Sequence, residues 1–137
     1  MSKSTGSCLC GAIHYECDVD PVAAGVCHCR HCQKTSGSAF STMIAVPENA
    51  LRITGTLSTY EDRGDDGGRT VLRKFCGRCG APIVSLTPMA PGIAFLKAGT
   101  LDDVSHLKPT FQCWHDSAQP WLHLDDSLAT FPRNPAL

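Results

Sequence analysis

The cysteines constrain the folding of this chain more than any other feature. It has nine cysteines in 137 residues, and seven of them fall into three tight groups. The groups are Cys8-Leu9-Cys10, Cys27-His28-Cys29-Arg30-His31-Cys32 and Cys76-Gly77-Arg78-Cys79. Disulfide frameworks usually contain an even number of cysteines and occur in exported proteins. The odd number and the close spacing therefore predict metal binding.

Composition predicts a globular chain rather than a disordered one. Hydrophobic residues make up 42% and charged residues 18%, and the length suits one domain over residues 1–137. The formal net charge of −1 lacks the basic excess of a nucleic-acid-binding domain. No apolar run approaches the ~18 residues of a membrane helix, and no signal-peptide pattern follows Met1. We expect a cytoplasmic protein that binds neither nucleic acid nor membrane.

Short segments with a period of two predict a mainly β fold. The segments are AIHYE (12–16), AFSTMIAV (39–46), RTVLRKF (69–75) and GIAFLKAG (92–99). A polar, glycine-rich stretch at 61–69 predicts a hairpin loop. Helix signals are limited to single turns around Thr100–Val104 and after Asp125 or Asp126. We expect short antiparallel strands, little helix and a core that benefits from a bound metal.

The segment FCGRCG, residues 75–80, is the strongest metal signal. A glycine after each cysteine lets the backbone turn tightly and direct its N–H groups at the sulfurs. This is the pattern of a zinc knuckle, whose thiolates bind zinc at about 2.3 Å. Thioredoxin-like chemistry would need a strand-to-helix context, and haem attachment would need a histidine after the second cysteine. A knuckle supplies two ligands, so two more must come from elsewhere in the chain.

Two partitions of the clustered cysteines meet this requirement. In the first, Cys8 and Cys10 complete the knuckle as a closed four-thiolate site. The central trio then forms a three-thiolate site of its own, made of Cys27, Cys29 and Cys32. In the second, two members of the trio complete the knuckle, and Cys8 and Cys10 are left over. We favour the first because zinc divides between closed structural sites and catalytic sites with an open position.

Cations and hydroxyls near the trio are candidates for substrate binding. Zinc held by three thiolates has a net charge of −1, and a thiolate substrate makes it −2, so positive groups are expected nearby. The candidates are Arg30, Lys34, Ser36 and Ser38 around the trio, with Arg73 and Lys74 before the knuckle.

Two histidines and two isolated cysteines need separate interpretation. His28 and His31 could ligate metal or act as general acid–base groups. In an extended segment His28 points away from the neighbouring cysteines, so we do not expect it to be a ligand. Cys17 and Cys113 have no partner at useful spacing and are expected to be buried thiols.

The order C-x-C, C-x-C-x-x-C and F-C-x-x-C-G resembles the glutathione-dependent formaldehyde-activating enzyme family, also called the GFA or CENP-V/GFA domain family. The similarity extends through GSCLCGAIHYE, CHCRHCQKTSGSAF, FCGRCGAPI and LKAGTLDD, from Gly6 to about Trp121. It implies a β-rich, tent-like zinc fold similar to the Mss4-like superfamily. It also implies the first partition. By position, Cys8, Cys10, Cys76 and Cys79 correspond to a structural zinc, and Cys27, Cys29 and Cys32 to a catalytic zinc.

The resemblance further implies an activity. The family joins glutathione and formaldehyde to form S-hydroxymethylglutathione, and is classed as a carbon–sulfur lyase for the reverse reaction. We therefore expect an enzyme with two zinc ions per chain that adds a small, glutathione-like thiol to formaldehyde or a related electrophile. The alternatives are a non-catalytic zinc-stapled binding module and a thiol redox or zinc sensor. A fourth ligand at the trio, from His28, His31 or Cys113, would favour the binding module.

Overall fold

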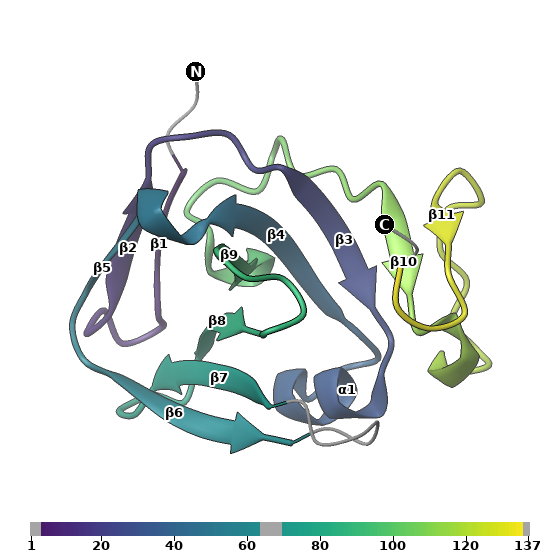
Figure 1. The fold of residues 1–137 in the computed structure, drawn as a ribbon, viewed down its shortest axis with the longest axis horizontal. Helices are drawn as coiled ribbons and strands as arrows, with labels where there is room; N and C mark the ends of the chain where they lie inside the picture. The colour runs from purple at the N-terminus through teal and green to yellow at the C-terminus, as the bar shows by residue number, and fades with distance from the viewer. Residues whose placement is uncertain (1–3, 64–69, 136–137) are drawn as a thin grey trace.

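The computed structural model describes residues 4–63 and 70–135, whose strands form two sheets (Figure 1). The larger sheet has the order β11-β10-β3-β4-β9-β8-β7-β6, and the smaller has the order β1-β2-β5. The strands are β1 (Ser4–Ser7), β2 (His14–Cys17), β3 (Ala23–Cys27), β4 (Ser41–Pro47), β5 (Leu51–Thr54), β6 (Leu57–Asp62), β7 (Val71–Cys76), β8 (Pro82–Leu86), β9 (Ile93–Lys97), β10 (Phe111–Cys113) and β11 (Ala129–Thr130). The helices are α1 (Arg30–Ser36) and three single turns, η1 (Glu48–Ala50), η2 (Ala98–Thr100) and η3 (His115–Ser117).

The expectation of a mainly β fold is confirmed, and each of the four alternating segments contributes a strand, namely β2, β4, β7 and β9. Most neighbouring strands are antiparallel, but β10 pairs in parallel with both β3 and β11. Strands β6 and β7 pair antiparallel, as a hairpin requires. Residues 64–69 of the expected hairpin loop lie outside the described residues. No helix within the described residues is long and apolar enough to cross a membrane.

The expected single turns are confirmed in part. The turn η2 includes Thr100, where the first was expected, and after Asp125 the N–H of Leu128 donates to the Asp125 carbonyl at 3.1 Å in a turn that does not extend to a helix.

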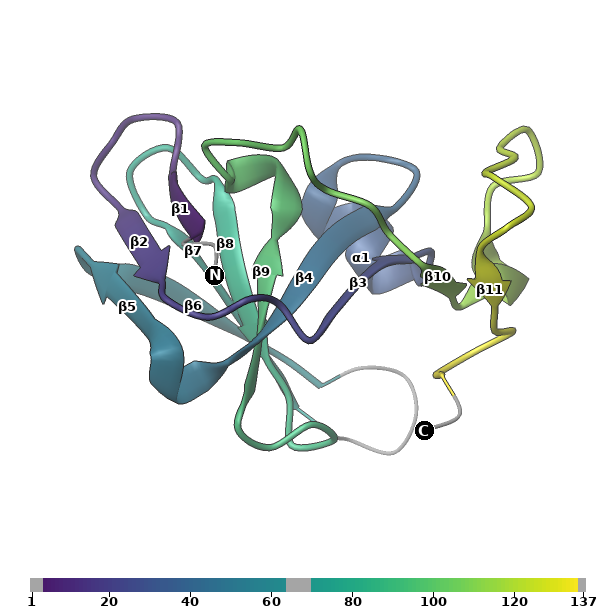
Figure 2. The same cartoon turned by 90° about the horizontal axis from the view of Figure 1, so that it is seen from above.

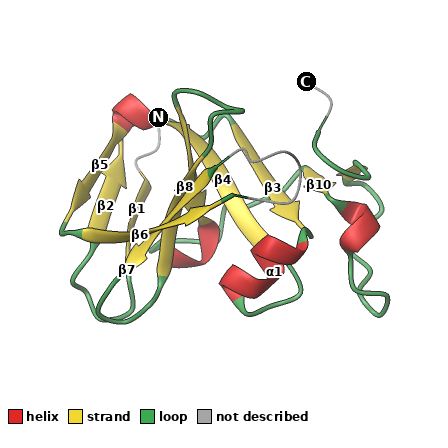
Figure 3. Cartoon of the chain, turned by 60° about the horizontal axis from the view of Figure 1, so that its bottom comes forward, coloured by secondary structure: helices red, strands yellow, loops and turns green. Residues whose placement is uncertain are grey.

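The α-helix is α1, which includes Cys32 of the trio (Figure 3). Its N-cap is Cys29, whose sulfur accepts the N–H of Cys32 at 3.2 Å, and it ends at Gly37 with φ +60°. Serine, threonine, aspartate or asparagine normally signals an N-cap, so a cysteine in that role concealed the helix.

The two faces of the larger sheet differ in chemistry. One face packs against the smaller sheet and forms the core, with Ile44, Val84 and Leu96 almost fully buried beside Ile13 and Tyr15. Burying one aliphatic side chain of this size stabilises the fold by about 1.5–3 kcal/mol.

The other face carries polar and sulfur-containing side chains. Strand registers pair Cys27 with Ser41, Met43 with Lys97, and Arg73 with Ser85. Because side chains alternate along each strand, these six residues share the face opposite to the core. The small sheet lies at one end of the molecule and β10 and β11 at the other (Figures 1 and 2). The polar face is therefore available for a site between the two ends.

Candidate metal centres and substrate site

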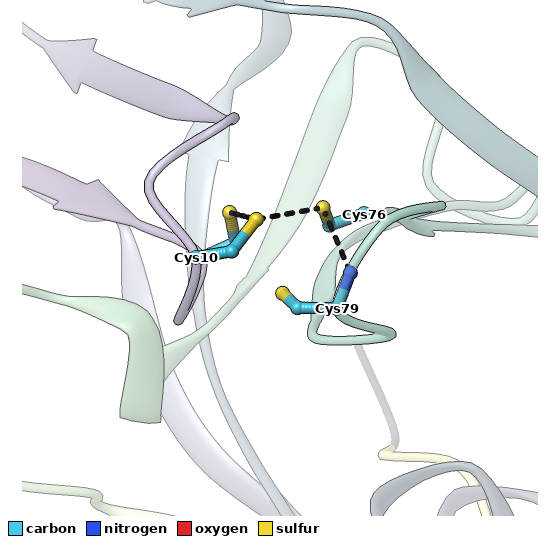
Figure 4. Close-up of side chains that lie close together, drawn as sticks. Cys10, Cys76 and Cys79 are labelled. Atoms are coloured by element: carbon cyan, nitrogen blue, oxygen red, sulfur yellow. Dashed lines mark hydrogen bonds between the residues drawn. The ribbon is translucent and has the colours of Figure 1, made fainter.

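Four cysteine sulfurs meet where turns from the two sheets approach each other (Figure 4). Cys8 and Cys10 come from the β1–β2 connection, and Cys76 and Cys79 from the β7–β8 turn. The Cys8 and Cys10 sulfurs are 3.6 Å apart, those of Cys10 and Cys76 are 3.7 Å apart, and all four lie within 4.8 Å of one another. Sulfurs bound at 2.3 Å to a tetrahedral zinc lie about 3.8 Å apart. The cluster therefore has the dimensions of a four-thiolate zinc site.

The β7–β8 turn prepares its sulfurs for the charged form. Gly80 has φ +81° and its N–H donates to the Cys76 carbonyl at 2.8 Å, a conformation that glycine adopts without strain. The N–H groups of Arg78 and Cys79 lie 3.4 and 3.5 Å from the Cys76 sulfur. Backbone N–H groups, that of Ala81 first, lower the pKa of Cys79 to about 6. The expectation that the turn directs its N–H groups at the sulfurs is confirmed.

A second cluster contains Cys27, Cys29 and Cys32, with all three sulfurs within 4.8 Å of one another. Cys27 ends β3, Cys29 is the N-cap of α1, and Cys32 lies in the first turn of α1. Because residues three apart lie on one side of a helical turn, the helix returns Cys32 to Cys29. The structure thus groups the seven cysteines as in the first partition; that they bind zinc stays a prediction.

Electrostatic contacts concentrate negative charge on one sulfur of the trio. Hydrogen bonds from Cys27 and Cys29 lower the pKa of Cys32 to about 2. The positive charges of Lys97 and Arg73 act in the same direction. Burial in turn lowers the pKa of Lys97 from its ordinary value, and the Cys32 charge opposes that effect. Cys32 is therefore held as the thiolate that a metal ligand must be, whereas the contacts among the sulfurs raise the pKa values of Cys27 and Cys29.

A buried carboxylate organises the side chains around the trio. Asp62 accepts a 2.7 Å hydrogen bond from Nε of Arg73, and its oxygens lie 2.9 Å from Nδ1 of His31. Asp62 therefore links the first turn of α1 to β7. On β9, Nζ of Lys97 donates to the hydroxyl of Ser41 on β4 at 3.2 Å. The cations beside the trio are held in place by protein contacts.

Comparison with known proteins decides the family. A family model described as glutathione-dependent formaldehyde-activating enzyme matches residues 3–117. The chain belongs to this family. Among solved structures, a Rhodobacter sphaeroides protein is 22% identical with a TM-score of 0.60, over 74% of this chain and 91% of that chain. At that identity the likeness shows the fold alone. No curated protein matches.

In this member of the GFA family, no fourth ligand completes the trio within the described residues. His28 is buried away from it, with Nε2 2.8 Å from the Gln112 side-chain oxygen, which agrees with the expectation that it is not a ligand. Cys113 lies closer. It pairs with Cys27 across β10 and β3, and a hydrogen bond between the two raises the pKa of Cys27. Cys113 and Cys17 are both buried, as expected.

The substrate-binding residues expected from the sequence line a broad hollow. Arg30, Lys34 and Ser38 surround a space of about 360 Å³ beside α1, and all three are solvent-exposed. Ser36 lies outside its lining and donates its hydroxyl to the Cys32 carbonyl at 2.7 Å. The prediction that these four side chains bind substrate is not tested by their positions.

A second, smaller cavity of about 170 Å³ contains residues that the sequence analysis missed. Its lining includes Arg73 and Lys74, which the sequence analysis named, together with Ser85 and Lys97, which it did not. One signal pointed to Lys97, because it is the single charged residue in the apolar segment GIAFLKAG. The neighbouring residues 82–88 contain nothing that distinguishes Ser85 from an ordinary strand serine.

Proposed function

We propose that this chain is a zinc-dependent enzyme of the carbon–sulfur lyase type. It adds a small, glutathione-like thiol to formaldehyde or a related electrophile. One observation carries the proposal: three thiols converge beside half-buried cations, and no fourth ligand joins them within the described residues. A thiol cluster of this kind suits a reducing cytoplasm, where cysteines stay unoxidised.

The donor sets suit zinc at both clusters, because thiolates are its preferred protein ligands. Cys8, Cys10, Cys76 and Cys79 would hold a structural ion, and Cys27, Cys29 and Cys32 a catalytic one. A catalytic zinc lowers the pKa of an incoming thiol and so supplies the nucleophilic thiolate near neutral pH.

The surrounding residues of the chain then have definite tasks. Lys97 and Arg73 offset the negative charge of the sulfurs, and Asp62 holds Arg73 and His31 in position. In the addition, the thiol sulfur bonds to the formaldehyde carbon, the C=O π bond breaks, and the thiol proton ends on the new hydroxyl oxygen. His31, beside the trio, is our candidate for moving that proton.

One observation favours the alternative of a non-catalytic, zinc-stapled module. The Cys113 sulfur contacts Cys27, so a small movement of β10 would bring a fourth thiol to the trio. A closed four-thiolate site has no position for substrate. The same proximity suits a thiol sensor in which Cys27 and Cys113 are oxidised together.

Metal content and cobalt substitution separate these functions. We expect two zinc ions per chain, and after cobalt substitution one centre whose absorption changes when glutathione is added and one that does not respond. The protein should also accelerate the formation of S-hydroxymethylglutathione from glutathione and formaldehyde, which NMR can monitor. A single metal per chain, or two centres that both ignore thiols, would overturn the proposal.

A further inference from the structure

The smaller cavity lies on the polar face of the larger sheet, beside the trio. Arg73 and Ser85 are register partners on β7 and β8, and Lys97 shares their face on β9. The rest of the lining is Thr35 of α1, Tyr60 of β6, Lys74, Gly80 and the apolar residues Phe75, Pro82 and Val84. No acidic side chain belongs to its lining in the described part of the chain. The cavity therefore carries positive charge, and the charges of its Lys97 and Arg73 also act on the Cys32 sulfur.

Ser85 is the second observation that indicates a ligand. Its residue is only 6% exposed, and its hydroxyl has no hydrogen-bond partner in the described residues. Buried hydroxyls are nearly always paired, because leaving one unpaired is unfavourable. The side chain of Arg73 is only 12% exposed, so its charge is also weakly screened by water. Arg73 is already ion-paired with Asp62 through Nε, so the unpaired group is the Ser85 hydroxyl. An anion with hydrogen-bond acceptors would pair with that hydroxyl beside the positive charges of Lys97 and Arg73.

We propose that this cavity binds a carboxylate of the thiol substrate, with Lys97 and Arg73 supplying positive charge and Ser85 donating a hydrogen bond. The inference rests on the proposed function and specifies where a carboxylate of its glutathione-like thiol is bound. Whole-ligand pockets typically measure about 300–1,000 Å³, so a cavity of about 170 Å³ accepts one arm of the substrate. The thiol end then reaches the trio.

The broad hollow beside α1 is the competing location for the carboxylate. Its cations, Arg30 and Lys34, are solvent-exposed. Exposed charges are hydrated and screened, so they discriminate weakly between charged and neutral ligands. The smaller cavity offers less-hydrated cations and an unpaired hydroxyl, which favours it as the carboxylate site.

Two thiols that differ in charge test the inference on the cobalt-substituted protein. One is 3-mercaptopropionate, which carries a carboxylate, and the other is the neutral 2-mercaptoethanol. We expect the carboxylate thiol to bind roughly 10- to 100-fold tighter, as one charge-assisted hydrogen bond allows. Lys97→Met should reduce the ratio of the two thiol affinities to near one. The ratio matters more than either affinity, because Lys97 also acts on the sulfur charge and so affects both thiols.

Ser85→Ala provides an independent measurement, since it removes one oxygen and leaves the packing of β8 intact. We expect it to reduce the ratio several-fold. Lys108→Gln, an exposed lysine outside both cavities, is the matched control and should leave the ratio unchanged. A ratio unchanged in both Lys97→Met and Ser85→Ala would overturn the inference, and so would a ratio lost in Lys34→Gln.

The outcomes also separate this inference from the proposed function. Equal binding of the two thiols to the unmodified protein would overturn the carboxylate site while leaving a thiol-binding metal centre. A cobalt centre that responds to neither thiol would overturn the proposed function, and the inference with it.

Discussion

The two cysteine clusters differ in how the chain delivers their sulfurs. The four-thiol cluster joins residues separated by as many as 71 positions, from Cys8 to Cys79, and connects turns of two different sheets. The three-thiol cluster lies within the six residues from Cys27 to Cys32, on the polar face of one sheet. A metal at the first cluster cross-links the fold, whereas a metal at the second is attached to a fold already formed.

This difference predicts unequal energetic roles. Structural zinc contributes about 10–16 kcal/mol of apparent binding free energy, comparable with the 5–15 kcal/mol that separates folded from unfolded domains. Cys8 and Cys76 are also part of the hydrophobic core. The four-thiol cluster should therefore govern stability, and the three-thiol cluster should govern thiol chemistry.

Replacing a sulfur of the four-thiol cluster should have the largest effect. We expect Cys76→Ser to lose the structural metal and, with it, most of the free energy of unfolding. Circular dichroism and metal quantitation would report the loss. A folded Cys76→Ser protein that keeps one metal and fails to respond to thiols would show that the two roles are reversed.

The equivalent change at the trio should leave the fold intact. We expect Cys29→Ser to retain the structural metal and a cooperative unfolding transition. Its total metal content should fall from two toward one per chain, because a hydroxyl is a poor zinc ligand compared with a thiolate. The cobalt absorption should no longer respond to glutathione. Unfolding of this variant would contradict the comparison, since it would make the local cluster a cross-link as well.

A smaller effect is expected at Cys113, the residue that would close the trio if it were a fourth metal ligand. Cys113→Ala should cost about 1 kcal/mol of stability, as an average substitution does, and should retain two metals. The cobalt spectrum without added thiol should match that of the unmodified protein. A spectral change before any thiol is added would show that Cys113 ligates the metal and that the module is closed.

The smallest effect is expected at a surface ion pair of the smaller sheet. Arg52 contacts Glu16 and Asp18, and its side chain is 54% exposed. Exposed pairs contribute less than about 1 kcal/mol, so Arg52→Ala should shift the denaturant midpoint slightly and alter neither cobalt centre. A change at the four-thiol centre would mean that the position of the smaller sheet depends on this pair as well as on the metal.

The β class and the three cysteine groups were accessible from the sequence because both depend on local patterns. Alternation over a few residues predicts a strand, and ligands two or three residues apart leave little choice of geometry. The helix α1 escaped prediction because the sulfur of Cys29 caps it. The parallel pairing of β10 with β3, which brings Cys113 to Cys27, joins residues 86 positions apart and has no local signal.

The sequence by itself determined the family, the mainly β class and which cysteines are close enough along the chain to act together. Only the tertiary structure decided which distant groups meet, because contacts across a sheet depend on strand register rather than on spacing along the chain. Register places Lys97 and Ser85 on the face of the trio, 65 and 53 positions after Cys32. The surroundings of the sulfurs follow from that register.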